Sequence, residues 1–386
     1  MVSYEDILDQ EIEWTKEKIV AYFRDVEGIM PAERVQRFAE GKGKADKIPL
    51  YLWLADEWGA HYNGFKLSEI CLNSKKLVCS YLNLCWRFKL EMWGSVFPYY
   101  YQLGPSAVGM KIEFPEDEPP VSPRGVVNEY RDIESLKVPN MRTEGYMPYH
   151  WEAYRIWKEK LSDLYPSHST FVGGPFDFAV QLRGVQGLQL FTDMKENREL
   201  VKELCDFSAD CIIEMAKIYQ EYGINILFLS EVTAVQLSPD DYMELEFPYI
   251  LKIRDAMKGK AIVSLSRQKS PEILDRIYAE GITLMGKPVP MVFTGNYYQP
   301  KRGYFPSLDD IMRDHQTAQE KGYPQNIYFL GQWLYDTSPG EIRHTIARVL
   351  DAVGPTSIVP TSIPMGTPVE SIDAYVEAMR STRWTE

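Results

Sequence analysis

Apolar and polar positions follow two different patterns along this chain of 386 residues. In the first 45 residues, apolar side chains recur at helical spacing through 5–29 and again through 31–41. After that, short runs that are mainly apolar, without strict alternation of apolar and polar positions, are separated by amphipathic segments. The runs lie at 48–54, 109–114, 169–176, 224–231, 260–266, 282–287, 326–331 and 356–362. Runs of this kind are typical of strands in a parallel sheet that is buried on both faces.

Four of the amphipathic segments begin with the same signal. A hydroxyl residue precedes a proline, and an acid follows within the first turn, as expected for a helix N-cap and first helical position. The hydroxyl residues are Ser238, Ser270, Ser338 and Thr367. Their separations fit one or two βα units, and about eight strands favour a closed (β/α)8 TIM barrel over an open sheet. We therefore predict an N-terminal helical extension over 1–45 and a barrel over 46–386.

Composition narrows the class of protein. The formal charge of -13 and the absence of basic runs disfavour a nucleic-acid partner. Five cysteines form no CxxC pair, and no Gly-rich nucleotide-binding motif follows a strand run. Neither an N-terminal signal-like segment nor an apolar run of membrane-spanning length is present. We expect a soluble cytoplasmic protein with reduced thiols, bound neither to nucleic acid nor to a membrane.

A barrel would place the active site at the carboxyl ends of its strands, so residues directly after the apolar runs are candidates. Glu231 ends one run, and Asp177 lies in a Gly-Pro loop where backbone can approach a ligand. Arg267 follows a third run and could clamp a substrate carboxylate or pair with Glu231. We expect Glu231, Asp177, Arg267 and Tyr298 to be catalytic; an ion pair between Glu231 and Arg267 is the structural alternative.

Aromatic residues make up 13% of the chain and cluster near some of these ends. Core packing is one interpretation, and an aromatic-walled pocket for a flat ligand is the other. Tyr297 and Tyr298 lie on a long loop of the kind that covers barrels. The residues expected to bind substrate are Trp58, His61, Tyr297, Gln332 and Trp333.

Four segments of the sequence resemble the uroporphyrinogen decarboxylase superfamily, and in particular its corrinoid-dependent methyltransferase branch. They lie at 113–140, 173–204, 237–253 and 354–380 and include the stretches GGPFDFAVQLRGVQG and GTPVESIDAYVEAMR. The resemblance implies a (β/α)8 barrel, in agreement with the pattern above. The decarboxylase itself is marked by an Arg-rich stretch near its N-terminus, whereas 47–62 here contains no arginine. Decarboxylation of uroporphyrinogen is therefore not expected, because its acid groups require arginine partners.

The resemblance also bears on zinc. Methyltransferases of this superfamily hold zinc with a His-x-Cys pair and a later Cys, and the metal activates a thiol. Here Ser264 and Ser266 stand at the His-x-Cys position, and Thr361 and Ser362 stand where the late Cys is expected. Neutral hydroxyls are poor zinc ligands, so we expect the thiol-activating zinc site to be absent.

A second zinc pattern of the superfamily, in the branch that demethylates aromatic methyl ethers, is Glu, fourteen residues, Glu, twenty residues, His. Glu231 and Glu246 match the first interval, but Arg267 replaces the histidine and cannot ligate a metal. A metal site would consist at best of Glu231 and Glu246. The alternative is that Glu246 only packs or is solvated on its helix.

The resemblance implies a methyltransferase of the O-demethylase type, which moves a methyl group from a small aromatic methyl ether to a corrinoid (cobalamin) on a partner protein. The alternatives are a metal-independent decarboxylase or lyase on the same barrel, and a catalytically inactive homologue that only binds a ligand. The expected partners are a small-molecule methyl donor, a corrinoid protein and a second copy of this chain.

Overall fold

The computed structural model forms two compact units from discontinuous parts of the chain. The structure describes residues 3–39, 47–53, 56–93, 99–167, 169–184, 188–265, 271–284, 305–320, 326–354 and 356–381. Unit 1 comprises Met1–Pro98, Ile156–Ser167 and Gly286–Glu386; unit 2 comprises Tyr99–Arg155 and His168–Met285. The two N-terminal helices of the expected extension belong to unit 1.

Unit 2 is built on a parallel sheet of four strands in the order β1–β2–β3–β4. The strands are β1 (Ser169–Gly173), β2 (Ile226–Ser230), β3 (Ile262–Leu265) and β4 (Thr283–Leu284). The register aligns Phe171 with Phe228 and Phe228 with Ser264. Every residue of β2 is buried, which is why its run is apolar throughout rather than alternating.

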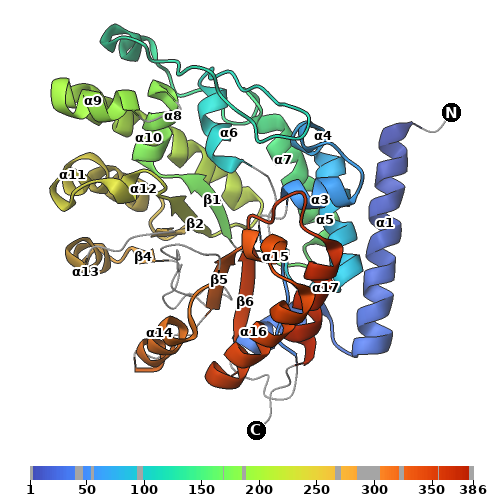
Figure 1. Cartoon of the computed structure of the whole chain (residues 1–386). Coiled ribbons are helices and arrows are strands. Elements are labelled where there is room, and N and C mark those ends of the chain that lie inside the picture. Colours follow the sequence, from blue (N-terminus) through green and yellow to red (C-terminus); the bar gives the residue numbers. More distant parts are fainter. Residues whose placement is uncertain are drawn as a thin grey trace. The chain divides into compact units, whose positions relative to one another are not determined.

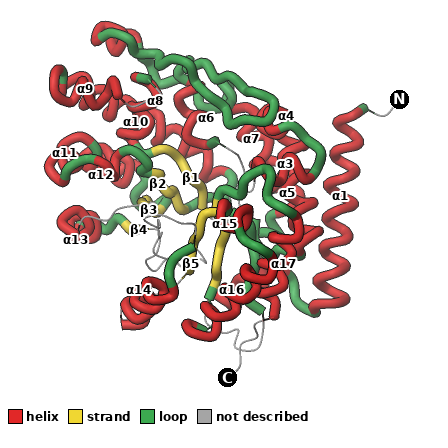
Figure 2. The backbone as a smooth tube through the Cα atoms, in the orientation of Figure 1, coloured by secondary structure: helices red, strands yellow, loops and turns green. Residues whose placement is uncertain are grey.

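In unit 2, helices α6 and α7 precede the first strand, and helices α8 to α13 lie between the strands in sequence and outside the sheet in space (Figures 1 and 2). Within them, α10 packs against both α8 and α12. The helices of unit 2 are α6 (Tyr100–Ala107), α7 (Met147–Ile156), α8 (Pro175–Arg183), α9 (Leu188–Glu196), α10 (Arg198–Glu221), α11 (Pro239–Leu245), α12 (Phe247–Ala256) and α13 (Pro271–Ala279). Strand–helix–strand alternation with parallel pairing confirms the α/β class.

Unit 1 contains the parallel pair β5 (Asn326–Leu330) and β6 (Ser357–Thr361). The first apolar run lies next to β6, because Trp53 forms a parallel bridge with Thr361 and its backbone N–H donates to Pro360 O at 3.3 Å. Thr361 is in turn aligned with Leu330. Three parallel segments therefore end side by side.

The helices of unit 1 come from both ends of the chain (Figure 1). The C-terminal helices α16 and α17 pack on each other, and α1 packs against α5. They are α1 (Tyr4–Tyr22), α2 (Pro31–Ala39), α3 (Asp56–Tyr62), α4 (Leu67–Leu72), α5 (Ser74–Phe88), α14 (Leu308–Glu320), α15 (Gln332–Asp336), α16 (Pro339–Val353) and α17 (Val369–Ser381).

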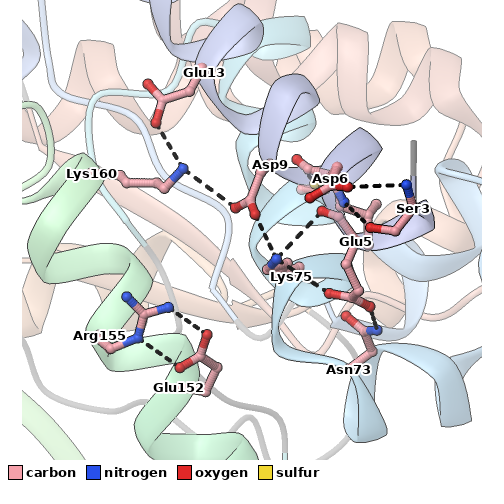
Figure 3. Close-up of polar contacts among 12 residues, drawn as sticks. Ser3, Glu5, Asp6, Asp9, Glu13, Asn73, Lys75, Glu152, Arg155 and Lys160 are labelled. Atoms are coloured by element: carbon pink, nitrogen blue, oxygen red, sulfur yellow. Dashed lines mark hydrogen bonds and ion pairs between the residues drawn. The ribbon is translucent and has the colours of Figure 1, made fainter. Parts of the chain in front are cut away.

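Helix α1 is held to unit 1 by a buried apolar stripe and by ion pairs at its edge. Its stripe includes Leu8, Ile12 and Ile19. Lys75 contacts Asp9 at 2.6 Å, and Figure 3 shows Lys160 also reaching this helix. Exposed pairs of this kind contribute at most about 1 kcal/mol each, so the buried stripe accounts for most of the attachment.

The capped helix starts are only partly as expected. Ser238 accepts a hydrogen bond from Asp241 N at 3.1 Å, and Ser338 accepts one from Glu341 N at 3.3 Å, so both are N-caps. Ser270 lies outside the described residues. Thr367 is not a cap of this kind, because its hydroxyl donates to Pro364 O at 2.8 Å and α17 begins at Val369.

Two predicted strands are wrong. In the described part of the run 48–54, Trp53 makes only an isolated parallel bridge and no strand forms. The run 109–114 forms no strand; Glu113 makes only an isolated antiparallel bridge with Val121. Gly109 has a φ of 109°, and Pro115 follows the run, so the backbone turns back through the Pro-rich loop instead of continuing into a sheet. Among the described helices, none is both long and apolar enough to cross a bilayer.

Gly331, directly after β5, packs closely against the loop that follows β6. A Cβ at Gly331 would lie 2.6 Å from Ile363 Cα, which is backbone and cannot rotate away. We expect Gly331→Ala to lower the free energy of unfolding by about 1–3 kcal/mol. At Gly340, in the first turn of α16, a Cβ would meet nothing within 4 Å, so Gly340→Ala should be neutral or stabilising. Urea midpoints would compare the two, and equal midpoints would contradict the close approach.

Candidate functional site

A buried acid lies close to the carboxyl end of each of the strands β1 and β2: Asp177 after β1 and Glu231 after β2. Glu231 directly follows β2, is 0% exposed and accepts a hydrogen bond from the phenol of Tyr242. Tyr242 lies on α11 and is itself fully buried. Gly174 follows β1, and its N–H donates to Ser230 O at 3.0 Å, so the two strand ends are joined.

Asp177 lies in the first turn of α8, three residues beyond Gly174. Its two carboxyl oxygens accept hydrogen bonds from Thr233 N at 2.7 Å and from Ala234 N at 3.2 Å. Burial raises the pKa of Asp177 to about 6, although these two N–H groups favour the ionised form. The residue therefore joins the loop after β2 to the helix after β1.

Glu246 occupies the break between α11 and α12 and is also 0% exposed. Its Oε2 atom accepts a hydrogen bond from Phe176 N at 2.7 Å. A Cβ at Gly174 would lie 2.7 Å from Glu246 Oε1 and 3.7 Å from Glu231 Cγ. The missing side chain at Gly174 thus makes room for both glutamates at the end of β1.

These three acids, Asp177, Glu231 and Glu246, form what we call the carboxyl cluster. Burial raises the pKa of Glu231 well above its usual value; the Tyr242 hydrogen bond lowers it and the charge of Asp177 raises it further. Burial likewise raises the pKa of Glu246, with added repulsion from Glu231 and Asp177. Like charges held this close in a buried site favour retention of protons. The cluster can therefore supply a proton to a bound group at neutral pH.

The raised pKa of Asp177 predicts a pH dependence of stability. An acid whose folded pKa lies above its unfolded value stabilises most when protonated. This contribution is complete below about pH 4 and is lost as the pH rises through about 6, a change of roughly 3 kcal/mol. Asp177→Asn should reduce the fall in unfolding free energy over that window, whereas Asp206→Asn, at an exposed pair on α10, should leave it unchanged. Urea unfolding at several pH values would measure both slopes, and equal slopes in Asp177→Asn and the unmodified protein would contradict the assignment.

The residues expected to bind substrate that the structure describes all lie in unit 1. Trp58 is 1% exposed and its indole N–H donates to Thr367 O at 2.8 Å, so it is a packed core residue in this structure. His61 is exposed on α3. Gln332 is half-buried and donates to Asp336 at 3.2 Å. The ring of Trp333 packs at a tilt against that of Phe305, with ring centroids 4.5 Å apart.

Three other expected site residues, Arg267, Tyr297 and Tyr298, lie outside the described residues, as does Ser266. Their expected roles in catalysis and binding stay predictions.

Sequence reasoning missed Tyr242 and the particular role of Gly174. Tyr242 is one of 25 tyrosines and looks like an ordinary apolar position on a capped helix. Only the fold brings its hydroxyl to Glu231. Gly174 was recognised as a position of close backbone approach, but not as the gap that admits Glu246. The Ser238 cap was the available signal, since it fixes where α11 begins and hence which of its residues face β2.

The donors needed for a thiol-activating zinc are not gathered in the part of the chain that the structure describes. There, no three His, Cys, Asp or Glu side chains are placed to hold a metal. Ser264, at the expected His-x-Cys position, is a fully buried residue of β3. All five cysteines are buried, and burial raises the pKa of each thiol, which opposes formation of thiolate ligands.

The fold and the site together describe an α/β protein whose parallel strands carry buried acids at their carboxyl ends. The family model for uroporphyrinogen decarboxylase (URO-D) matches residues 30–382. The chain therefore belongs to the uroporphyrinogen decarboxylase family, as the sequence resemblance indicated.

Curated relatives include both decarboxylases and a methyltransferase. A uroporphyrinogen decarboxylase of Schizosaccharomyces pombe is 26% identical over 186 residues, which cover 46% of this chain and 48% of that enzyme. A methylated-thiol–coenzyme M methyltransferase of Methanosarcina mazei is 23% identical over 280 residues, covering 71% and 69%. The match thus spans about half of the yeast enzyme and somewhat more than two thirds of the archaeal one.

A solved structure of a methyltransferase from Methanosarcina mazei superimposes with a TM-score of 0.67. The superposition covers 92% of this chain and 99% of that one at 17% sequence identity. At this identity the likeness establishes a shared fold.

Proposed function

We propose that the protein is a methyltransferase that moves a methyl group from a small methyl ether, of aromatic type, to a reduced corrinoid carried by a separate protein. The corrinoid is here a substrate delivered by its carrier. The archaeal relative named a methyltransferase supports transfer chemistry, and the missing arginines at 47–62 argue against uroporphyrinogen, whose acid groups require arginine partners.

The carboxyl cluster is the observation that carries this proposal. An ether oxygen is a poor leaving group unless it receives a proton as the C–O bond breaks. A buried acid with a raised pKa keeps that proton at neutral pH and can deliver it. Glu231 is the central member, because Tyr242 fixes its position and Asp177 and Glu246 oppose its ionisation.

Zinc does not fit the described residues as a thiol-activating centre, since hydroxyls replace the soft ligands. Glu231 and Glu246 are two hard oxygen donors, and Arg267 cannot complete their set. The proposed mechanism therefore relies on the carboxyl groups of this chain, and none of its steps involves a metal.

We propose a closed (β/α)8 barrel as the scaffold. In such a barrel the last strand pairs with the first. The bridge between Trp53 and Thr361 has that connectivity, since it joins the first apolar run to β6. The parallel order β1–β2–β3–β4 fits the successive neighbours that a barrel requires.

A second candidate is a metal-independent decarboxylase or lyase. It is favoured by the named decarboxylases among the relatives and by Asp177, whose buried carboxyl could protonate a carbanion after loss of CO2. Arg267 would hold the substrate carboxylate. A homologue that binds a ligand without turnover is the remaining alternative.

The test is methyl transfer from a panel of aromatic methyl ethers to a reduced corrinoid protein, followed by the absorbance change of the cobalt centre and by release of the phenol. Turnover by the wild-type protein, and its loss in Glu231→Gln, is the expected result. Release of CO2 from carboxylated analogues without methyl transfer would favour the second candidate. Ligand binding without either product would favour the inactive homologue.

A further inference from the structure

Unit 1 has a buried carboxyl of its own at a strand edge, and the proposed reaction does not use it. Asp56 begins α3, three residues after Trp53, and is 9% exposed. Its Oδ1 atom is buried and has no hydrogen-bond partner in the described parts of the chain. An unpaired buried acceptor costs about 1–3 kcal/mol, and most such groups in folded proteins have partners. The other residues at this strand edge bear on what kind of group could bind to Asp56.

Three parallel segments end together at this edge. Trp53 pairs with Thr361, and Thr361 pairs with Leu330. Ligands of parallel α/β proteins bind where such strands end. Asp56 is therefore placed at the edge that binding sites use.

Backbone strain marks the same edge independently. Ser362 follows β6 with a φ of 52°, in the left-handed region that side chains other than glycine and asparagine rarely adopt. It is held there by a hydrogen bond from its N–H to Trp53 O at 3.3 Å. Strained residues of this kind cluster at ligand sites, where the surrounding structure holds them in place.

The edge also offers apolar surface. Leu330, the last residue of β5, is 38% exposed, and Tyr335 on α15 is 48% exposed. Side chains of this kind can contact the apolar body of a ligand whose polar group reaches a buried acid.

We propose that Asp56 binds the hydroxyl group of a small ring-bearing ligand at the edge formed by Trp53, β5 and β6. The inference concerns unit 1 alone and does not depend on methyl transfer, so either proposal can fail without the other.

A hydroxyl is favoured over charged groups for a chemical reason. Burial, with added repulsion from Glu57, raises the pKa of Asp56 to about 7, so both protonation states are populated near neutral pH. A hydroxyl donates to the carboxylate and accepts from the carboxylic acid, and it matches either state. An ammonium can donate to either state but is matched in charge only by the carboxylate, and a carboxylate ligand can only accept and so matches only the acid.

The experiment uses phenol and anisole, which share a ring but differ in having a free hydroxyl. Binding to the full-length chain would be measured by calorimetry and by backbone amide shifts of Ser362. We expect phenol to bind and anisole to bind at least about tenfold more weakly, since one hydrogen bond to a charged group is lost. Asp56→Leu, which keeps the size of the side chain, should weaken phenol binding about tenfold. Asp56→Asn, which still offers a donor and an acceptor, should change it by less than about threefold.

Glu57→Gln is the matched control, because it changes the neighbouring acid and should leave phenol binding intact. Urea unfolding would check that the variants are folded, and Asp56→Ala takes the place of Asp56→Leu if the latter does not fold. Three results would overturn the proposal: no phenol binding by the wild-type protein, equal binding of phenol and anisole, or unchanged phenol affinity in a folded variant that lacks the polar group of Asp56.

Discussion

Replacing Glu231 with glutamine is expected to lower kcat for methyl transfer by about a hundredfold or more, which is the usual contribution of a positioned general acid. The amide keeps the size of the side chain and can still accept a hydrogen bond from Tyr242. It cannot give up a proton to the leaving oxygen. Substrate affinity should change much less than kcat, because the proton is needed only as the bond breaks.

Two further variants separate this role from a structural one. Tyr242→Phe removes the hydroxyl that holds Glu231, so it should lower kcat less than Glu231→Gln and shift its pH profile. Glu199→Gln, at an exposed acid on α10, should leave kcat unchanged. Steady-state rates across pH 5–9 would give both kcat and KM. If Glu231→Gln retains the wild-type kcat, the carboxyl cluster is not the source of the proton.

A donor panel makes the same variants more informative. A phenyl ether bearing an electron-withdrawing ring substituent has a better leaving group and needs less help from an acid. Glu231→Gln should therefore lose less activity with that donor than with an unactivated ether. A loss that is equal for the two donors would assign Glu231 to binding or folding.

The runs that became strands were predictable because burial on both faces leaves a simple mark in the sequence. β2 and β6 are buried at every position, and both were found from apolar continuity alone. The run 109–114 carries Lys111 and Glu113 within it and turns at Gly109 and Pro115. Its apolar content was too low to separate a strand from an extended loop.

The site was predictable only as far as it depends on chain order. Glu231 follows β2 directly, and Asp177 lies in the first turn of the helix after β1, so their place near the strand ends could be expected. The contact between Glu246 and the end of β1 depends on a residue 70 positions earlier. Trp58 was expected at a ligand, but the course of the C-terminal segment places Thr367 O against its indole. Contacts of this range follow from tertiary packing and leave no local pattern.

The expected extension over 1–45 illustrates the same limit. Its helical pattern is visible in the sequence, and α1 and α2 form as predicted. The sequence pattern does not reveal that Arg34 is only 2% exposed and bonds to Glu91 at 2.7 Å. A buried charge in a helix that looked peripheral ties it to the core of unit 1.

Glu91 is the centre of that attachment. Its Oε1 accepts hydrogen bonds from Arg34 at 2.7 Å and from Arg380 at 2.8 Å, and its Oε2 accepts one from Leu50 N at 2.9 Å. One buried carboxylate thus joins α2, the first apolar run and α17, which lie at opposite ends of the chain. Arg34 also contacts Glu27 at 2.9 Å.

Glu91→Ala is therefore expected to lower the free energy of unfolding of unit 1 by about 3–5 kcal/mol, because it leaves the Arg34 charge buried without its main partner. The double variant Arg34→Met with Glu91→Leu should be more stable than Glu91→Ala, since it removes the charge and its partner together. Glu33→Ala, at an exposed pair with Arg37 on the same helix, should change stability by less than about 1 kcal/mol. Urea unfolding followed by tryptophan fluorescence would rank the three. A Glu91→Ala variant as stable as Glu33→Ala would mean that apolar packing, and not this network, holds α2 in unit 1.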